Sequence, residues 1–177
     1  MDFSELIRVR QSDRKYSSKT VEKEKIIQCI EAARLSPSAC NSQPWRFIVV
    51  DDQELKDQIA DSSASLGMNK FTFESPVIIA VVLEKMKLTA SVGSVLKDKE
   101  YSLMDIGISV NQLCLQAAEL GLGTCIIGWF NESRVKELLQ VPKSKRVPLI
   151  ISLGYSEART RDKTRKPLEE IYSWNKY

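Results

Sequence analysis

The spacing of apolar and polar positions along the chain predicts alternating helices and strands. After Thr20, a residue suited to begin a helix, apolar residues recur at helical spacing from Ile26 to Ala33. Pro37 is expected to end that helix, because proline cannot continue one. A second, shorter helix is expected after Asn131, which can cap its first turn.

Four apolar runs, rich in β-branched residues, predict strands. In the second run, at 77–83, the apolar residues do not alternate with polar ones, so helices are expected to cover both faces of the sheet. Asp51 follows the first run, and Glu54 comes three residues later, a capping-box pattern that predicts a helix there. The runs lie at 46–50, 77–83, 124–130 and 146–155.

The longest helical pattern covers 103–120 and is apolar nearly all round, with Ile106 on one side and Ile108 on another. A chain of 177 residues suits a single domain over 1–177, which has little room for a wholly central helix. We therefore expect this helix at the interface of a homodimer. Residues 156–177 have no core of their own and are expected to dock on the partner subunit, and 84–100 reads as a loop or short helix.

Composition narrows the possible functions. The chain contains no histidine, which excludes Ser-His and Cys-His nucleophile pairs, and its four cysteines lack metal-ligand spacing, so no metal site is expected. The apolar runs are too short to cross a membrane and no secretory signal is evident, so a cytoplasmic location is expected. A net charge of +3 is too small to indicate nucleic-acid binding.

Basic residues cluster near both ends, in "RVRQSDRK" and "ARTRDKTRK". In an extended segment Arg10, Ser12 and Arg14 would share one face, so two guanidinium groups and a hydroxyl would meet an anion, most naturally a phosphate. Lys163 and Arg165 repeat this spacing. The alternative is that both clusters are solvated basic surface.

The loop "SPSACNSQPW" (36–45) is rich in hydrogen-bonding side chains but contains no acid or base. Together with R-x-S-x-R near residue 10, "DIGISVNQLCLQAAELGLGTCIIG" and K-x-R-K-P near the end, it resembles the nitroreductase family of FMN-dependent oxidoreductases over almost the whole chain. The resemblance implies an α+β, nitroreductase-like fold: a central mixed β-sheet flanked by helices, in a homodimer with FMN sites at the interface.

The resemblance also implies roles for individual residues. Arg10 and Ser12 would lie near the FMN phosphate and ribityl chain, and Arg14 near the pyrimidine edge of the ring. The family's lysine near the ring matches Lys70, whereas the asparagine often found three residues earlier is Gly67 here. The residues implied to bind the cofactor are Arg10, Gln11, Ser12, Arg14, Pro37, Ser38, Asn41, Lys70, Ile127, Gly128, Lys163 and Arg165, with Ser38 and Asn41 reaching the flavin from the partner subunit.

The function implied by the resemblance is reduction of nitroaromatics, quinones or similar small acceptors by NADH or NADPH, through ping-pong hydride transfer at flavin N5. No side chain is catalytic in that scheme, and Arg14 tunes the flavin. Cys40 lies in the loop without a base beside it, which disfavours a redox role. The alternatives are a specialised relative that performs dehalogenation or flavin chemistry, a flavin-binding protein without turnover, and a nucleic-acid binder.

Overall fold

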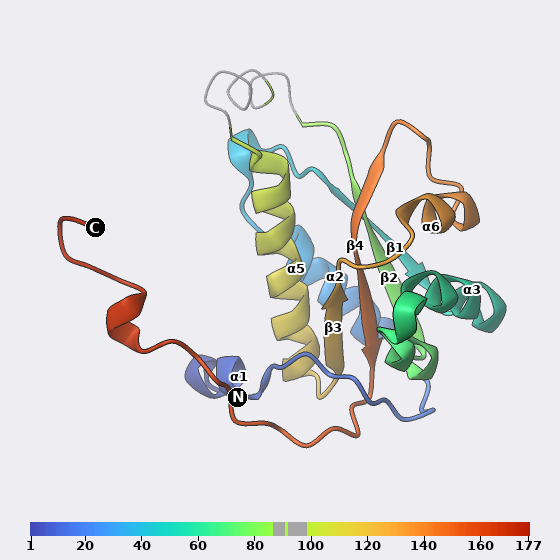
Figure 1. Cartoon of the computed structure of the whole chain (residues 1–177), viewed down its shortest axis with the longest axis horizontal. Helices are drawn as coiled ribbons and strands as arrows, with labels where there is room; N and C mark the ends of the chain where they lie inside the picture. The colour runs from blue at the N-terminus through green and yellow to red at the C-terminus, as the bar shows by residue number, and fades with distance from the viewer. Residues whose placement is uncertain (87–90, 92–98) are drawn as a thin grey trace.

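The computed structural model describes residues 1–86, 91 and 99–177. Its four strands form one sheet in the order β1-β2-β4-β3, and every neighbouring pair is antiparallel (Figure 1). The sheet is therefore antiparallel rather than mixed, because an apolar run predicts a strand but not its direction. The strands are β1 (Trp45–Val50), β2 (Val77–Leu83), β3 (Gly123–Ile127) and β4 (Arg146–Gly154).

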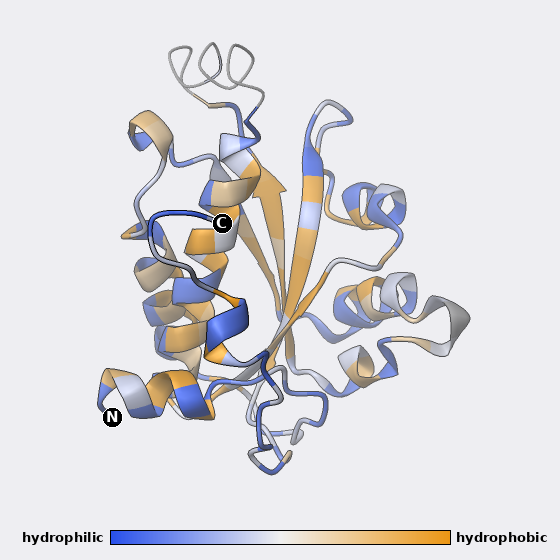
Figure 2. Cartoon of the chain, turned by 60° about the vertical axis from the view of Figure 1, so that its left-hand side comes forward, coloured by the Kyte–Doolittle hydropathy of each residue, from blue (hydrophilic) through white to orange (hydrophobic). Residues whose placement is uncertain are grey.

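Helices cover both faces of the sheet, as the unbroken apolar strands predicted (Figure 2). Alternate residues of β2 belong to two cores: Ile79 lies in the core with α2 and α5, and Ile78 lies in the core with α3 and α6. The α-helices are α1 (Phe3–Val9), α2 (Lys23–Arg34), α3 (Gln53–Ser63), α5 (Tyr101–Glu119) and α6 (Glu132–Leu138). The 3-10 helices are η1 (Ala39–Asn41), η2 (Ser65–Gly67), η3 (Lys70–Glu74) and η4 (Leu168–Glu170).

The ends of several elements differ from the sequence expectation. Asp52 rather than Asp51 caps α3, accepting a hydrogen bond from the Leu55 amide, and β3 ends at Ile127 instead of continuing to residue 130. Helix α1 was not predicted, although Phe3, Leu6 and Ile7 recur at helical spacing, and none of its residues is buried. The segment expected as a loop or short helix over 84–100 lies mostly outside the described residues.

One face of α5 packs in the core, and the opposite face is apolar and exposed. Ile106 and Val110 are buried against α2 and the sheet, whereas Met104 and Ile108 are 53% and 42% exposed. The chain after residue 167 extends away from the body and exposes further large apolar side chains, including Trp174 (Figure 1). Among the helices described, none combines the length and apolar character needed to cross a membrane.

Candidate functional site

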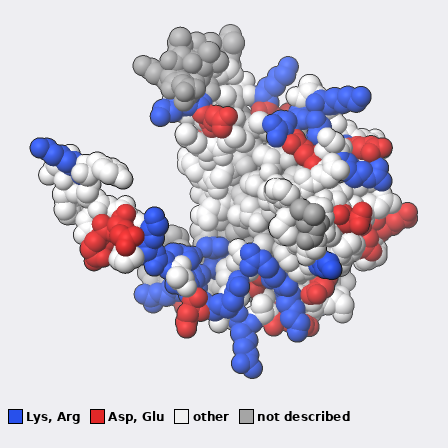
Figure 3. Space-filling view, viewed as in Figure 1, with Lys and Arg blue, Asp and Glu red and all other residues white. Residues whose placement is uncertain are grey.

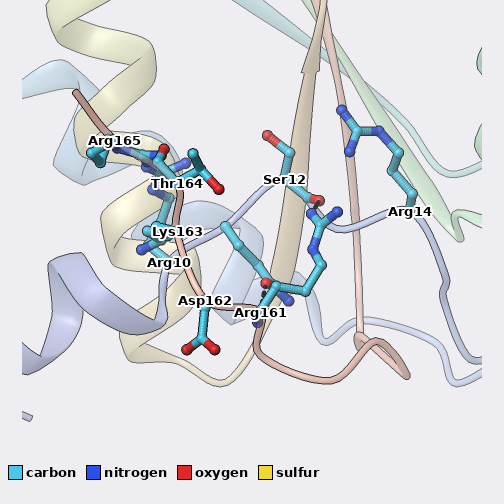
Figure 4. Close-up of a pocket in the computed structure, with 9 residues that line it drawn as sticks. Arg10, Ser12, Arg14, Arg161, Asp162, Lys163, Thr164 and Arg165 are labelled. Carbon is cyan, nitrogen blue, oxygen red and sulfur yellow. Dashed lines mark hydrogen bonds between the residues drawn. The ribbon is translucent and has the colours of Figure 1, made fainter.

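An extended segment beside the free edge of β3 forms one wall of a cavity. Ser12 pairs with Thr124 as in a parallel sheet, and the Asp13 amide donates to the Thr124 carbonyl at 2.8 Å. A Cβ at Gly123 would lie 2.8 Å from Asp13 Cγ, so this close approach requires glycine. The cavity has a volume of about 250 Å³ and is lined by Arg10, Gln11, Ser12, Arg14, Arg161, Asp162, Lys163, Thr164 and Arg165 (Figure 4).

Buried polar side chains hold the second wall, the segment after β4, against the first. The Gln11 carboxamide donates to Asp13 Oδ1 at 3.0 Å and to the Arg159 carbonyl at 3.2 Å, and its oxygen accepts from the Arg161 amide at 3.1 Å. Ser156 Oγ donates to Asp13 Oδ1 at 2.6 Å. The predicted alternation is present in part, since Asp13 is buried and does not line the cavity, whereas Gln11, although buried, lines it together with Arg10, Ser12 and Arg14.

The cavity concentrates positive charge from both ends of the chain: five cations and one acid, Asp162, line it. Lys163 Nζ donates to the Ile7 carbonyl at 2.6 Å and also to the Arg8 carbonyl, near the end of α1. Burial and the Arg10 and Arg165 cations lower the pKa of Lys163. An anion among these groups would offset their mutual repulsion and accept charge-assisted hydrogen bonds.

Two loops continue the site beyond Arg14. The Arg14 guanidinium carbon lies 5.9 Å from the centroid of the Phe71 ring, so η3 adjoins this side of the cavity. Lys70 is in the same element but is exposed and does not line the cavity. At the end of β3, Ile127 is buried and can offer only its backbone, whereas Gly128 is exposed.

The loop that contains Pro37, Ser38 and Asn41 is not brought to this cavity by its own chain. The Ala39 amide bonds Asp105 near the start of α5, whereas the α-amino group of Met1 bonds Glu119 at the other end. At 1.5 Å per residue, those two points of α5 are about 20 Å apart. In Figure 1 the segment that precedes β1 reaches the start of α5, whereas α1 lies at the other end of that helix. The expectation that Ser38 and Asn41 serve the partner's site stays a prediction.

Sequence reasoning missed three residues of the cavity. Arg161 donates from Nη2 to the Ser12 carbonyl at 2.8 Å, and Asp162 and Thr164 lie beside it (Figure 4). All three belong to the basic run from which only Lys163 and Arg165 were chosen, so the signal was present. Lys and Arg side chains gather on the lower part of the face seen in Figure 3.

The four cysteines differ in accessibility. Burial raises the pKa of Cys114 and of Cys125, and it raises that of Cys29 to about 12. Cys40, in the loop at 36–45, is exposed, and all four thiols are free. A thiol-specific reagent should therefore react first with Cys40.

Known proteins match this chain in sequence and in fold. The sequence profile of the nitroreductase family matches residues 7–155. An oxygen-insensitive NADPH nitroreductase of Helicobacter pylori strain 26695 is 30% identical over 193 aligned positions, which cover 92% of this chain and 89% of the relative. The putative NAD(P)H nitroreductase YdgI of Bacillus subtilis is 26% identical, and the match covers 98% of this chain and 97% of that protein.

Solved structures of nitroreductase family proteins also match the fold of this chain. A nitroreductase family protein of Clostridium difficile 630 superposes with a TM-score of 0.82 at 27% identity over the full length of both chains. An FMN-dependent nitroreductase of Clostridium difficile R20291 gives a TM-score of 0.81 at 28% identity, covering 97% of this chain and 98% of that one. These matches place the chain in the class of oxidoreductases. It belongs to the nitroreductase family, as the sequence motifs predicted.

Proposed function

We propose that this protein is an FMN-dependent NAD(P)H oxidoreductase that reduces nitroaromatics, quinones or similar small electron acceptors. The observation that carries the proposal is the convergence of cations from residues 10–14 and 161–165 on one cavity beside β3. If these side chains only faced water, nothing would require them to gather around one cavity. The names of the Helicobacter and Clostridium relatives agree with this donor and cofactor.

The residues of the cavity fit FMN chemically. Arg10, Lys163 and Arg165 can hold the phosphate through charge-assisted hydrogen bonds, and Ser12 can bond a ribityl hydroxyl. Arg14, on the side toward Phe71, would hold the pyrimidine edge of the ring. When bound there, FMN would supply the redox chemistry at its N5 position between NAD(P)H and the acceptor, in the ping-pong order that one shared pocket implies.

The protein's own part in this chemistry is binding, orientation and electrostatics. Arg14 brings a fixed positive charge to the ring side of the cavity, and its contact with Phe71 restricts where the guanidinium can lie. Gly128 leaves its backbone accessible, since a Cβ there would meet only Leu149, at 3.9 Å. No step requires a side chain to move a proton, which fits a chain without histidine.

The proposed active form is a homodimer. Met104 and Ile108, one turn apart on α5, are both apolar and exposed, as are side chains of the extended tail, and a partner could bury them. In such a dimer the loop at 36–45 would complete the partner's FMN site, which neither chain completes alone. The single domain over 1–177 and the cytoplasmic location stay predictions.

The absorbance spectrum of freshly purified protein tests the proposal, followed by FMN titration and anaerobic addition of NADH or NADPH. We expect flavin bands that bleach when the donor is added and return when menadione or a nitroaromatic follows. A protein that neither carries nor takes up FMN would overturn the proposal. Bound flavin that no nicotinamide reduces would instead indicate a flavin-binding protein without turnover.

Replacing Arg14 with alanine should lower the reduction potential of bound FMN by roughly 30–60 mV. This range corresponds to losing about 1.5–3 kcal/mol of a charged hydrogen bond in a two-electron couple. Arg14→Lys keeps the charge and should recover part of the shift. The measurement is an anaerobic redox titration of flavin-loaded variants, and a potential in Arg14→Ala equal to that of the wild type would contradict the assigned role.

A further inference from the structure

A stripe of polar side chains runs along the otherwise apolar helix α5. Asp105, Ser109 and Gln112 are spaced i, i+4 and i+7, which places them on one face of the helix. All three contact the chain that leaves α2 and enters the loop at 36–45. Asp105 accepts from the Ala39 amide with both oxygens, at 3.2 and 3.1 Å.

The other two members bond the residues just before η1. Ser109 Oγ donates to the Ala33 carbonyl in the last turn of α2, at 3.1 Å. Gln112 Oε1 accepts from Ser36 Oγ at 2.8 Å. Ser109 therefore joins α5 to the end of α2, whereas Gln112 and Asp105 bond the chain that follows α2, and Asp105 holds the point at which η1 begins.

Burial makes the Asp105 contact significant. The residue is only 5% exposed, and a carboxylate withdrawn from water is costly unless hydrogen bonds satisfy it. An apolar residue at this position would suit the buried packing of α5 as well as its neighbour Ile106 does. The presence of an acid at position 105 is thus explained by its hydrogen bonds with the Ala39 amide, and not by the packing of the helix.

The loop itself needs to be held. Cys40, Asn41 and Gln43 all have positive φ, at 51°, 50° and 49°. Each such non-glycine residue costs of order 1–3 kcal/mol and persists only where the surroundings enforce it. Ser38 Oγ accepts from the Gln43 amide at 2.9 Å inside the loop, and Asp105 supplies the contact from outside, immediately before the first of these residues.

We propose that Asp105 is a positioning residue, which, assisted by Gln112, holds the loop at 36–45 in the conformation that completes the FMN site of the partner subunit. The inference rests on the proposed function. The same helix carries Met104 and Ile108 on its exposed apolar face, so association of two chains through α5 would set the loop against the partner's cavity.

The test compares Asp105→Ala and Asp105→Asn with Ser109→Ala as a matched control. Ser109→Ala also removes a buried bond of α5, but that bond goes to α2 and not to the loop. Asparagine can still accept from the Ala39 amide through its oxygen. Loop order is measured without cofactor, by amide hydrogen exchange over 36–45 and by the rate at which Ellman's reagent labels Cys40. Affinity for FMN is measured by titration.

In Asp105→Ala we expect loop exchange and Cys40 labelling to quicken, and FMN to bind about tenfold or more weakly, as for a lost bond to a charged acceptor. Asp105→Asn keeps an acceptor for the Ala39 amide, and Ser109→Ala leaves the bonds to the loop in place. Both variants should therefore stay within about threefold of wild type in loop order and in FMN affinity. If Asp105→Ala gave the same loop order and the same FMN affinity as Ser109→Ala, the proposal would be overturned. Where Asp105→Ala does not fold, Gln112→Ala replaces it. Because its bond to Ser36 is neutral, loop exchange and Cys40 labelling should still quicken, and FMN should bind about two- to tenfold more weakly.

A mixing experiment separates this inference from the proposed function. Arg10→Ala and Asp105→Ala chains, each weak in FMN binding, should form heterodimers in which one of the two sites recovers, because the defective cavity and the defective loop then fall in the same site. No recovery in verified heterodimers would overturn the action on the partner. A wild-type protein that binds no FMN would overturn the proposed function, while exchange of the loop still decides whether Asp105 holds it.

Discussion

Replacing both Arg10 and Arg165 with alanine should weaken FMN binding by about two to four orders of magnitude. Each guanidinium is expected to make a charge-assisted hydrogen bond to the phosphate, worth about 1.5–3 kcal/mol, and 1.36 kcal/mol corresponds to a factor of ten. Lys163 is left in place because it also bonds the Ile7 and Arg8 carbonyls, and its loss would disturb α1. Quenching of flavin fluorescence during titration gives the dissociation constant.

Lys166→Ala is the matched control for this experiment. Lys166 follows Arg165 directly, is exposed and does not line the cavity, so its removal lowers the net charge of the region without touching the proposed phosphate contacts. FMN affinity in this variant should change only slightly, and less at high salt, because a distant exposed charge is screened. If the double variant bound FMN as tightly as Lys166→Ala does, the phosphate site would have to lie elsewhere.

Ile108→Glu should convert the proposed dimer into monomers and abolish FMN retention. Ile108 lies on the exposed apolar face of α5, and burying an unpaired carboxylate in an interface costs several kcal/mol per copy. At 1.36 kcal/mol per factor of ten, the dimer dissociation constant should rise by about a thousandfold or more. Sedimentation velocity measures the association, and the flavin absorbance of the purified protein measures the cofactor.

Ser133→Glu places the same charge on α6, across the sheet from α5, and should leave both association and flavin content unchanged (Figure 1). Two results would contradict the arrangement proposed here. An Ile108→Glu protein that stays dimeric would remove α5 from the interface. A monomeric Ile108→Glu protein that keeps FMN at wild-type affinity would show that the loop of the partner is not needed for binding.

Local sequence patterns determined much of the framework. The apolar runs predicted all four strands and the burial of β2 on both faces, and Asn131 caps α6 as expected, accepting from the Arg134 amide. The expectation that Arg10, Ser12 and Arg14 meet at one site also holds, because alternate side chains of an extended segment share one side whatever surrounds it, although Gln11 lines the cavity as well. These properties depend on residues only a few positions apart.

Only the tertiary structure decided which distant residues meet. It joined Arg161 to Ser12, placed Lys163 against the end of α1, and held the loop at 36–45 and the N-terminus at points of α5 about 20 Å apart. The antiparallel direction of the strands and the contact between Asp105 and Ala39 were likewise invisible in the sequence. Periodicity reports the environment of one element, whereas these contacts depend on the path of the whole chain, which brings residues separated by 66 to 156 positions together.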